Sequence, residues 1–291
     1  MKVFYSADYI AAAQAFDTTR KSGWIVESLA TNPVAGVEIV APAPLTFNEI
    51  ASVHDAAYVK SVRRGEPKHL AESQGFTWDP GIWTAVTASN GGVIAAACAA
   101  LTDGVSGSLS SGMHHAQQGR GASFCTFNGL VLAAKKILGQ GARSILILDL
   151  DAHCGGGTHS LIESDDRIRQ IDVSVNVVDA YWQNGINTLD IVRDADNYLT
   201  TIEARLNEPV SYDICIYNSG MDADERCEVG GFAGINADIL RQREEMVFSW
   251  AKKRGVPIAF VLAGGYAGAA LTQDELVNLH RHTIASAQSI S

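Results

Sequence analysis

The sequence predicts an α/β fold in which a mostly parallel central sheet is covered by helices on both faces. From about residue 105 onward, short apolar runs alternate with longer amphipathic segments. Near-continuous apolar runs indicate strands buried on both faces, and the helices between them supply the crossovers that parallel strands need. The chain has 291 residues, of which 47% are hydrophobic, so we expect one large core and a single domain over residues 1–291.

Two strands and one long helix are expected in the first hundred residues. KVFYS (2–6) and VEIVAP (37–42) fit short strands. GIWTAVTASNGGVIAAACAAL (81–101) is alanine-rich and apolar on all sides, which is typical of a buried helix.

Five further strands and three further helices are expected from residue 105 onward. The strands are predicted at 105–110, 144–151, 168–176, 211–220 and 257–266. The helices are predicted at 125–141, 194–206 and 235–255. The first and last of these helices end in glycine, a residue that commonly terminates a helix.

Charge and composition argue against two classes of partner. The 22 basic and 32 acidic residues leave a formal charge of −10, which does not suit binding to a phosphate backbone. No apolar run reaches the roughly 18 residues of a membrane span, and the first thirty residues lack the pattern of a secretory signal. The five cysteines contain no CxxC pair, so a disulfide framework is not indicated. We therefore expect a cytoplasmic protein that binds neither nucleic acid nor membrane.

Three polar residues at the end of the run SILIL predict a ligand site. Asp149, Asp151 and His153 occupy alternate positions, so they lie on the same side of an extended chain. Ligands of open parallel sheets bind at this edge. Buried carboxylates need a cation or a complete hydrogen-bond network, and carboxylate beside imidazole suits zinc. On these residues alone, a satisfied buried network explains the pattern as well as a metal does.

Asp222 favours a metal site over a buried hydrogen-bond network, because it follows another apolar strand and reaches the same edge of the sheet. One histidine and two aspartates leave a coordination position for water, which is the pattern of a catalytic zinc. The adjacent His114 and His115 follow the strand at 105–110 and suit proton transfer near neutral pH. Tyr266, after two glycines, can donate a hydrogen bond to a carbonyl oxygen that gains negative charge.

Five segments occur in a fixed order between residues 105 and 270: SGMHHA, SFCTFNG, DLDAHCGGG, SGMD and LAGGY. Together with a weaker match at VHDAAYV (53–59), they resemble the signature motifs of the histone deacetylase superfamily, including acetoin-utilisation and acetylpolyamine amidohydrolase proteins. The resemblance implies the arginase/deacetylase fold and one histone deacetylase-like catalytic domain. It also implies zinc-dependent hydrolysis of an N-acyl amide, with acylated lysine, an acylated polyamine or another small amide as substrate.

The resemblance gives each of these residues a role. The implied Zn²⁺ ligands are Asp151, His153 and Asp222. The implied catalytic residues are the general base His115, its neighbour His114, the supporting Asp149, and Tyr266. The implied walls of the substrate tunnel are Ser123, Phe124, Gly264 and Gly265. The implied ligands of a structural K⁺ or Na⁺ are Asp149, His153, Ser174 and Val175.

Several positions depart from the family pattern. Most members carry an aspartate or asparagine where this chain has Gly156, so we expect His115 to lack the side chain that would orient it, with a loss of activity. Ser111 replaces a proline and Ser123 replaces a glycine, which is expected to narrow or re-polarise the tunnel. The run of glycines at 155–157 matches no phosphate-binding motif and is expected to give backbone flexibility. Cys154 is expected to be a small buried packing residue.

Other functions remain open at this point. Gly156 favours a non-catalytic, zinc-stabilised module that binds an acyl-lysine or small amide. A small-molecule amidohydrolase such as an acetylpolyamine deacetylase is a second alternative. Two-metal hydrolysis would need further bridging aspartates, for which Asp149 and Asp224 are the nearby candidates. The sequence does not specify the acyl chain, the amine or the oligomeric state.

Overall fold

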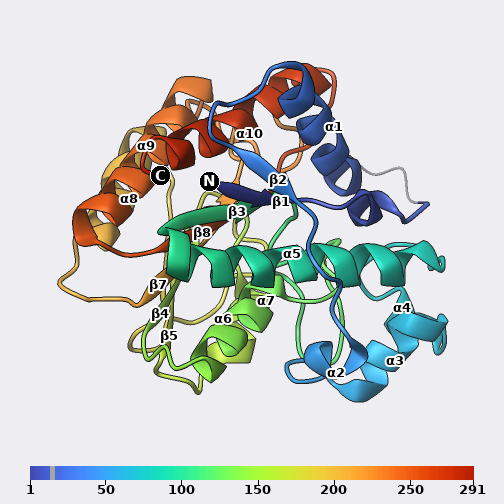
Figure 1. Cartoon of the computed structure of the whole chain (residues 1–291). Coiled ribbons are helices and arrows are strands. Elements are labelled where there is room, and N and C mark those ends of the chain that lie inside the picture. The colour runs from blue at the N-terminus through green and yellow to red at the C-terminus, as the bar shows by residue number, and fades with distance from the viewer. Residues whose placement is uncertain (14–16) are drawn as a thin grey trace.

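A computed structural model describes residues 1–13 and 17–291, and these residues form a layered structure around one eight-stranded sheet (Figure 1). The strand order is β2-β1-β3-β8-β7-β4-β5-β6, and each neighbouring pair is parallel. The strands are β1 (Lys2–Phe4), β2 (Glu38–Val40), β3 (Val105–Ser108), β4 (Ile145–Asp149), β5 (Ile168–Ser174), β6 (Thr188–Ile191), β7 (Ile214–Gly220) and β8 (Ile258–Ala263). The predicted α/β class with a parallel central sheet is confirmed.

Helices cover both faces of the sheet, as Figure 1 shows. One face carries α1 (Asp17–Thr31), α8 (Tyr198–Leu206), α9 (Ala237–Arg254) and α10 (Gln273–Gln288). The other face carries α5 (Gly81–Asp103), α6 (Gly129–Gly139) and α7 (Gly156–Ile162). Three short helices lie near the start of α5: α2 (Phe47–Ile50), α3 (Ala56–Arg64) and α4 (Lys68–Ala71). Two 3-10 turns, η1 (Ala7–Ile10) and η2 (Ala195–Asn197), complete the described elements.

Strand β4 shows how the alternation of side chains builds two cores. Leu146 and Leu148 pack with the layer that contains α8, α9 and α10, whereas Ile145 and Ile147 pack with α5 and α6. Successive side chains of a strand point to opposite faces, so a strand covered on both sides must be apolar throughout. This explains why SILIL is a continuous apolar run.

The sequence prediction differs from the structure at several elements. β6 was not expected, because TLDI contains an aspartate and has no continuous apolar run. The helix predicted at 125–141 begins only at Gly129, where the side chain of Asn128 accepts a hydrogen bond from the Val131 N–H and caps the helix. Several predicted strands end early because their last residues belong to the loops at the sheet edge.

Helix α5 is long and apolar enough, by length and composition, to cross a membrane. Serine, threonine and asparagine interrupt its apolar residues, so a continuous apolar run of that length was not expected. Most of the helix is buried, and it packs on β3, β8 and α6. We therefore interpret α5 as the buried core helix that the sequence analysis expected.

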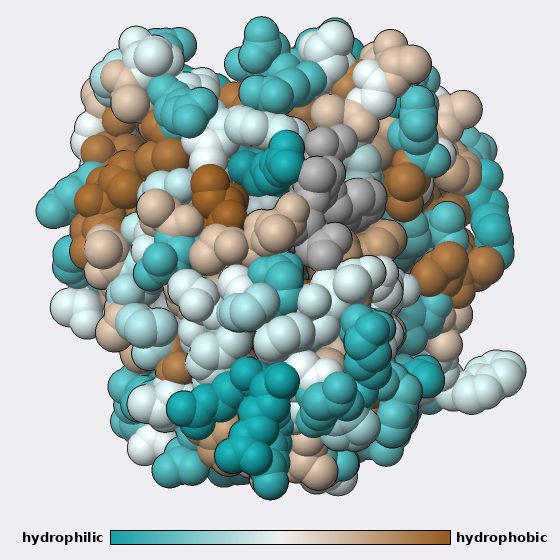
Figure 2. All heavy atoms as spheres, turned by 90° about the vertical axis from the view of Figure 1, so that its right-hand side faces the viewer, coloured by the Kyte–Doolittle hydropathy of each residue, from teal (hydrophilic) through white to brown (hydrophobic). Residues whose placement is uncertain are grey.

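The carboxyl ends of the parallel strands lie on one side of the molecule. β1 runs from the N-terminal mark toward the right of Figure 1, and the other strands share its direction. Figure 2 views the molecule from that side and shows apolar side chains in separate groups among polar ones. A site at the carboxyl ends of the strands opens toward this face.

A buried ion pair of α9 stabilises the packing of this helix near the carboxyl end of β4. Arg243 and Glu244 are both fully buried, and the Arg243 Nε donates to Glu244 Oε1 at 2.8 Å. The guanidinium also donates to the Leu150 carbonyl at 3.1 Å, and Glu244 accepts from the Tyr217 hydroxyl at 2.6 Å. Arg243 thus links helix α9 to the loop that follows β4.

Replacing Arg243 with methionine is expected to lower the free energy of unfolding by about 3–5 kcal/mol, because the Glu244 carboxylate would stay buried without its partner. Arg241→Met, on the exposed face of the same helix, is expected to change it by less than about 0.5 kcal/mol. Urea unfolding followed by circular dichroism measures both values. An Arg243→Met variant as stable as Arg241→Met would contradict this account of the pair.

Candidate active site

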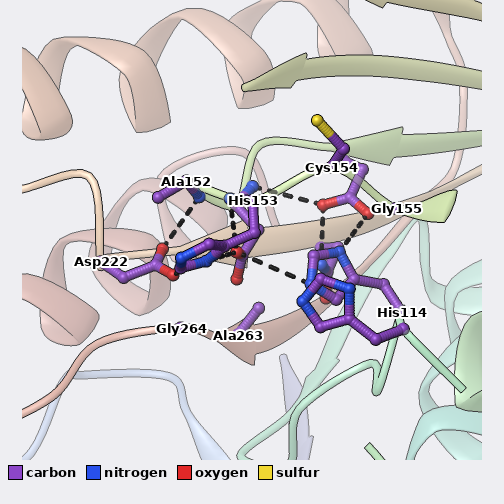
Figure 3. Close-up of polar contacts among 12 residues, drawn as sticks. His114, Ala152, His153, Cys154, Gly155, Asp222, Ala263 and Gly264 are labelled. Carbon is purple, nitrogen blue, oxygen red and sulfur yellow. Dashed lines mark hydrogen bonds and ion pairs between the residues drawn. The ribbon is translucent and has the colours of Figure 1, made fainter. Parts of the chain in front are cut away.

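The carboxyl ends of β4 and β7 bring the predicted metal ligands together. β4 and β7 are neighbours, with Asp149 in register with Asn218, so the segments that follow them run side by side. His153 Nδ1 lies 3.1 Å from Asp151 Oδ1 and 3.1 Å from Asp222 Oδ2. Figure 3 shows His153 and Asp222 pointing toward one another.

The chemistry of this trio fits a divalent metal ion. One ligand atom from each of Asp151, His153 and Asp222 lies within 4.8 Å of the others, and all three residues are buried. Two buried carboxylates at this distance repel each other unless positive charge lies between or beside them. Carboxylate oxygens with an imidazole nitrogen are a zinc-type ligand set, and three protein ligands leave room for water or substrate.

Lys21 of α1 supplies further positive charge to this region. Its Nζ is buried and donates to the carbonyls of Ala263 at 2.6 Å and Gly264 at 2.7 Å. Burial lowers the pKa of this ammonium to about 8, against the opposing effect of the Asp222 and Asp151 carboxylates. The lysine therefore fixes the segment that leads to the predicted catalytic tyrosine.

His114 is held by a carboxylate from strand β4. Its Nδ1 lies 2.8 Å from Asp149 Oδ2, and the other oxygen of Asp149 accepts from the Asn218 side chain at 2.8 Å. Burial alone would lower the pKa of His114, but the carboxylates of Asp149 and Asp151 outweigh it and raise the pKa to about 10. The predicted support of His114 by Asp149 is thus present in the geometry.

His115 has a carboxylate partner that the sequence analysis did not find. Its Nδ1 lies 2.8 Å from Asp179 Oδ2, so the expectation that His115 lacks an orienting side chain is wrong. Burial and the neighbouring charge on His114 lower the pKa of His115, although Asp179 acts in the opposite direction. The two imidazole rings lie 4.0 Å apart between centroids.

The three glycines after Cys154 allow close packing, and flexibility is not needed to explain them. A Cβ on Gly155 would lie 2.6 Å from Asp149 Oδ2, and one on Gly157 would lie 2.3 Å from the His115 carbonyl carbon. None of the three adopts a left-handed φ. The start of α7 therefore lies directly against the histidine pair.

A cavity of about 100 Å³ leads to this site. Its wall includes Asp151, the histidine pair, Tyr266 and three of the four predicted tunnel residues: Ser123, Phe124 and Gly264. The Phe124 ring lies 5.4 Å from the ring of Phe76, which the sequence analysis did not single out. Gly265 lies behind the wall, where a Cβ would be 2.6 Å from Leu276 Cδ1.

Backbone strain is concentrated at this site. In the described ranges 1–13 and 17–291, four non-glycine residues have a left-handed φ, namely Met113, Ser123, Phe124 and Asp179. Three line the cavity and the fourth contacts His115. Such conformations cost about 1–3 kcal/mol each and persist where the surrounding structure holds them, commonly at functional sites.

Two of the predicted cation ligands, Ser174 and Val175, lie at the carboxyl end of β5, while Asp149 contacts His114 and His153 belongs to the metal triad. The Ser174 hydroxyl donates to Asp172 Oδ1 at 2.5 Å, and the Val175 N–H donates to the Ala152 carbonyl at 3.1 Å. Asp172, a buried carboxylic acid that the sequence analysis did not consider, pairs in register with Asp149. The structural K⁺ or Na⁺ site remains a prediction.

The histone deacetylase domain family matches residues 15–188, which is more than half of the chain. The chain belongs to the histone deacetylase family. The matched region contains the histidine pair, Asp151 and His153, while Asp222 and Tyr266 follow it and reach the site through β7 and β8.

Several curated proteins are similar to this histone deacetylase family member. An uncharacterised protein of Picosynechococcus sp. is 32% identical over 224 residues, which cover 74% of each chain. Histone deacetylase 2 of Arabidopsis thaliana is 29% identical over 212 residues, covering 66% of this chain but 52% of the plant protein. A probable deacetylase of Archaeoglobus fulgidus is 29% identical over 135 residues, 45% of this chain and 38% of its own length.

Solved structures share the fold. The HD domain of HDA15 superimposes with a TM-score of 0.80 at 19% identity, covering 100% of this chain and 90% of that one. Acetylpolyamine aminohydrolase from Burkholderia pseudomallei also gives 0.80, at 16% identity, covering 100% and 99%. These matches support the arginase/deacetylase fold that the sequence motifs implied.

Cys154 is placed as the sequence analysis expected. Its thiol is buried, donates to the Asn176 carbonyl at 3.1 Å, and points away from His153 and Asp222 in Figure 3. Burial raises its pKa to about 12, and its contact with the Asn176 carbonyl directs the thiol away from the metal triad.

Removal of one carboxylate from the triad is expected to abolish tight metal binding. Loss of an outer partner of a metal ligand costs about 10–100-fold in affinity, so Asp222→Ala is expected to weaken zinc binding by at least about 100-fold. Cys154→Ala is expected to bind zinc like the natural chain. Competition with a fluorescent chelator measures both affinities, and unchanged binding by Asp222→Ala would exclude the triad as the site.

Proposed function

We propose that this protein hydrolyses N-acyl amides, with an acylated lysine or polyamine as the substrate class and zinc as the metal. One observation carries the proposal: the buried trio of Asp151, His153 and Asp222 reaches, through Asp151, a cavity that a carboxylate-supported histidine pair and Tyr266 also line. Family membership supports the same chemistry. A cytoplasmic location belongs to the proposal as well.

Asp151, His153 and Asp222 would hold the zinc ion. Bound there, zinc would polarise an amide carbonyl and lower the pKa of a water molecule. The residues of the chain then have three tasks: to accept the proton of that water, to stabilise negative charge on the carbonyl oxygen, and to protonate the departing amine.

His115 is the proposed proton acceptor. Its Nδ1 faces Asp179, which leaves Nε2 as the atom that takes up a proton. His115 is buried and lines the cavity beside Asp151, so the reacting proton has a short path to the ring. The carboxylates beside His114 raise its pKa to about 10 against the effect of burial, which favours a positive charge on His114 and lowers the pKa of His115. His115 would then return the proton to the departing amine.

Tyr266 is the proposed donor to the carbonyl oxygen. It lines the same cavity as Asp151, and burial together with the Asp222 carboxylate raises its pKa well above the ordinary value. The phenol therefore keeps its proton and can donate a hydrogen bond to an oxygen that gains charge. Lys21 holds the carbonyls of Ala263 and Gly264 just before this residue.

The alternatives are less well supported by the geometry. Asp224, a candidate bridging ligand for two-metal hydrolysis, accepts from the Arg226 Nε at 2.8 Å and is committed to that ion pair. A binding module without catalysis rested on the missing partner of His115, and Asp179 supplies one. A small-molecule amide as substrate stays within the proposal.

A panel of fluorogenic acyl-lysine and acyl-polyamine amides tests the proposal, using zinc-loaded protein with and without chelator. We expect chelator-sensitive turnover with a preference for one acyl length. Tyr266→Phe is expected to keep its zinc while turnover falls by about 10²–10³-fold, as for loss of one oxyanion donor. Full activity of Tyr266→Phe would show the assigned role to be wrong, and stoichiometric zinc without any turnover would favour the binding module.

The pH dependence should report His115. The active form of a general base is deprotonated, and the pKa of His115 lies below its ordinary value of 6.5. The ratio kcat/KM is therefore expected to rise with pH, with the midpoint of the acidic limb below about 6.5. Initial rates between pH 5 and 9 measure it. A midpoint above pH 7 would be inconsistent with His115 as the base in this environment.

A further inference from the structure

We propose that Asp179 is the positioning residue for His115 and that residue 156 is glycine because this carboxylate approaches from another part of the chain. The inference rests on the proposed function, in which His115 takes up a proton at Nε2. It assigns a role to the loop between β5 and β6 (residues 175–187), which none of the sequence motifs covers.

The contact between the two side chains fixes which nitrogen of His115 carries hydrogen. Asp179 Oδ2 lies 2.8 Å from His115 Nδ1, and a carboxylate can only accept. Nδ1 must therefore be protonated, so that in the neutral ring Nε2 is free to act as a base. In other histidines that transfer protons or bind metal ions, an acceptor beside one ring nitrogen selects the tautomer in the same way.

A second donor holds the same oxygen in place. The Gly157 N–H at the start of α7 donates to Asp179 Oδ2 at 3.0 Å. Because α7 follows directly after the metal-ligand segment, this bond ties Asp179 to the frame of the site. The Gly157 N–H needs a hydrogen-bond acceptor at that position, so a variant of residue 179 that keeps an acceptor there can keep this bond.

The backbone of the loop brings Asp179 into position. Asp179 has a φ of +61°, which aspartate and asparagine tolerate better than most residues. The Ala180 N–H donates to the Val177 carbonyl at 3.1 Å and closes a turn around it. The Cys154 N–H donates to the Val178 carbonyl at 3.0 Å, which attaches the turn to the segment after β4.

Residue 156 must be small for this arrangement to exist. A Cβ on Gly156 would lie 2.3 Å from the Asp179 carbonyl oxygen and 2.6 Å from its Oδ1. The nearer atom belongs to the backbone, so a rotation of the Asp179 side chain cannot relieve the contact. A side chain at 156 and the observed position of Asp179 therefore exclude each other.

The two histidines of the pair thus receive carboxylates of different origin. Asp149, which supports His114, is the last residue of a central strand and is fully buried. The side chain of Asp179, on a surface loop, is 22% exposed. Substitutions in the β5–β6 loop can therefore change the carboxylate partner of His115, whereas the partner of His114 lies in a central strand.

Three variants test the inference on full-length, zinc-loaded protein. Asp179→Gly removes the acceptor while tolerating the positive φ, and Gly156→Ala pushes the loop away. Asp179→Asn keeps an acceptor, because the Gly157 N–H selects the amide oxygen for the position next to His115. Two controls make matched changes elsewhere: Asp213→Asn, whose carboxylate accepts from the Arg143 and Ser144 N–H groups just before β4, and Gly139→Ala, where a Cβ meets nothing within 4 Å.

The ring nitrogen shifts of His115, read by long-range ¹H–¹⁵N NMR, report its tautomer without any need for turnover. We expect the Nδ1–H tautomer in the natural chain, in Asp179→Asn and in both controls, and a tautomer mixture in Asp179→Gly and Gly156→Ala. On the best amide substrate, kcat of the latter two should fall about 10–100-fold with KM within about 3-fold, while Asp179→Asn stays within about 10-fold.

An unchanged tautomer and unchanged kcat in Asp179→Gly would overturn the inference. If that variant does not fold, the same result in Gly156→Ala would overturn it. Absence of turnover in the natural chain, with the tautomer still dependent on Asp179, would instead refute the proposed function and leave the positioning role supported.

Discussion

The repulsion between two buried carboxylates is the constraint on which the rest of this site depends. Asp151 and Asp222 come from the ends of neighbouring strands, and both approach the same imidazole nitrogen of His153. Charges of one sign cannot share a buried site unless opposite charge accompanies them. Lys21 and His114 contribute such charge at the margins, and a divalent ion between the three ligand atoms would contribute most.

The parallel sheet makes this concentration of charge sterically feasible. Apolar side chains fill most of both faces of β4, β7 and β8, so the polar residues gather at the carboxyl ends of these strands and in the loops that follow. The buried Arg243 reaches the same loop from behind through the Leu150 carbonyl. The site is therefore held by packing below it and by hydrogen bonds from the helix layer, while strained residues such as Phe124 shape the cavity above it.

The sequence predicted those parts of the fold and site that depend on local patterns. Alternation of apolar runs and helices identified the parallel sheet, and period-two spacing placed Asp151 and His153 on one side. Asp179 and Lys21 could not be found this way, because each acts through a contact between segments far apart in the chain. Gly156 was the one available signal: a missing carboxylate beside a retained histidine pair indicates that the partner comes from elsewhere.

Local patterns also failed where tertiary contacts determine the structure. β6 forms from a sequence with no apolar run because it pairs with β5 at the edge of the sheet. Helix α5 was recognised as buried, yet its length and composition alone would also fit a membrane span, and only its packing on β3 and β8 distinguishes the two. The glycines at 155–157 suggested flexibility, whereas the distances show that they allow three segments to meet.

X-ray absorption at the zinc edge of the zinc-loaded protein tests the central claim most directly. The account predicts a first shell of nitrogen and oxygen at about 2.0–2.2 Å, with one imidazole and no sulfur. A sulfur scatterer at about 2.3 Å would place the ion on a cysteine and contradict the assignment of Asp151, His153 and Asp222.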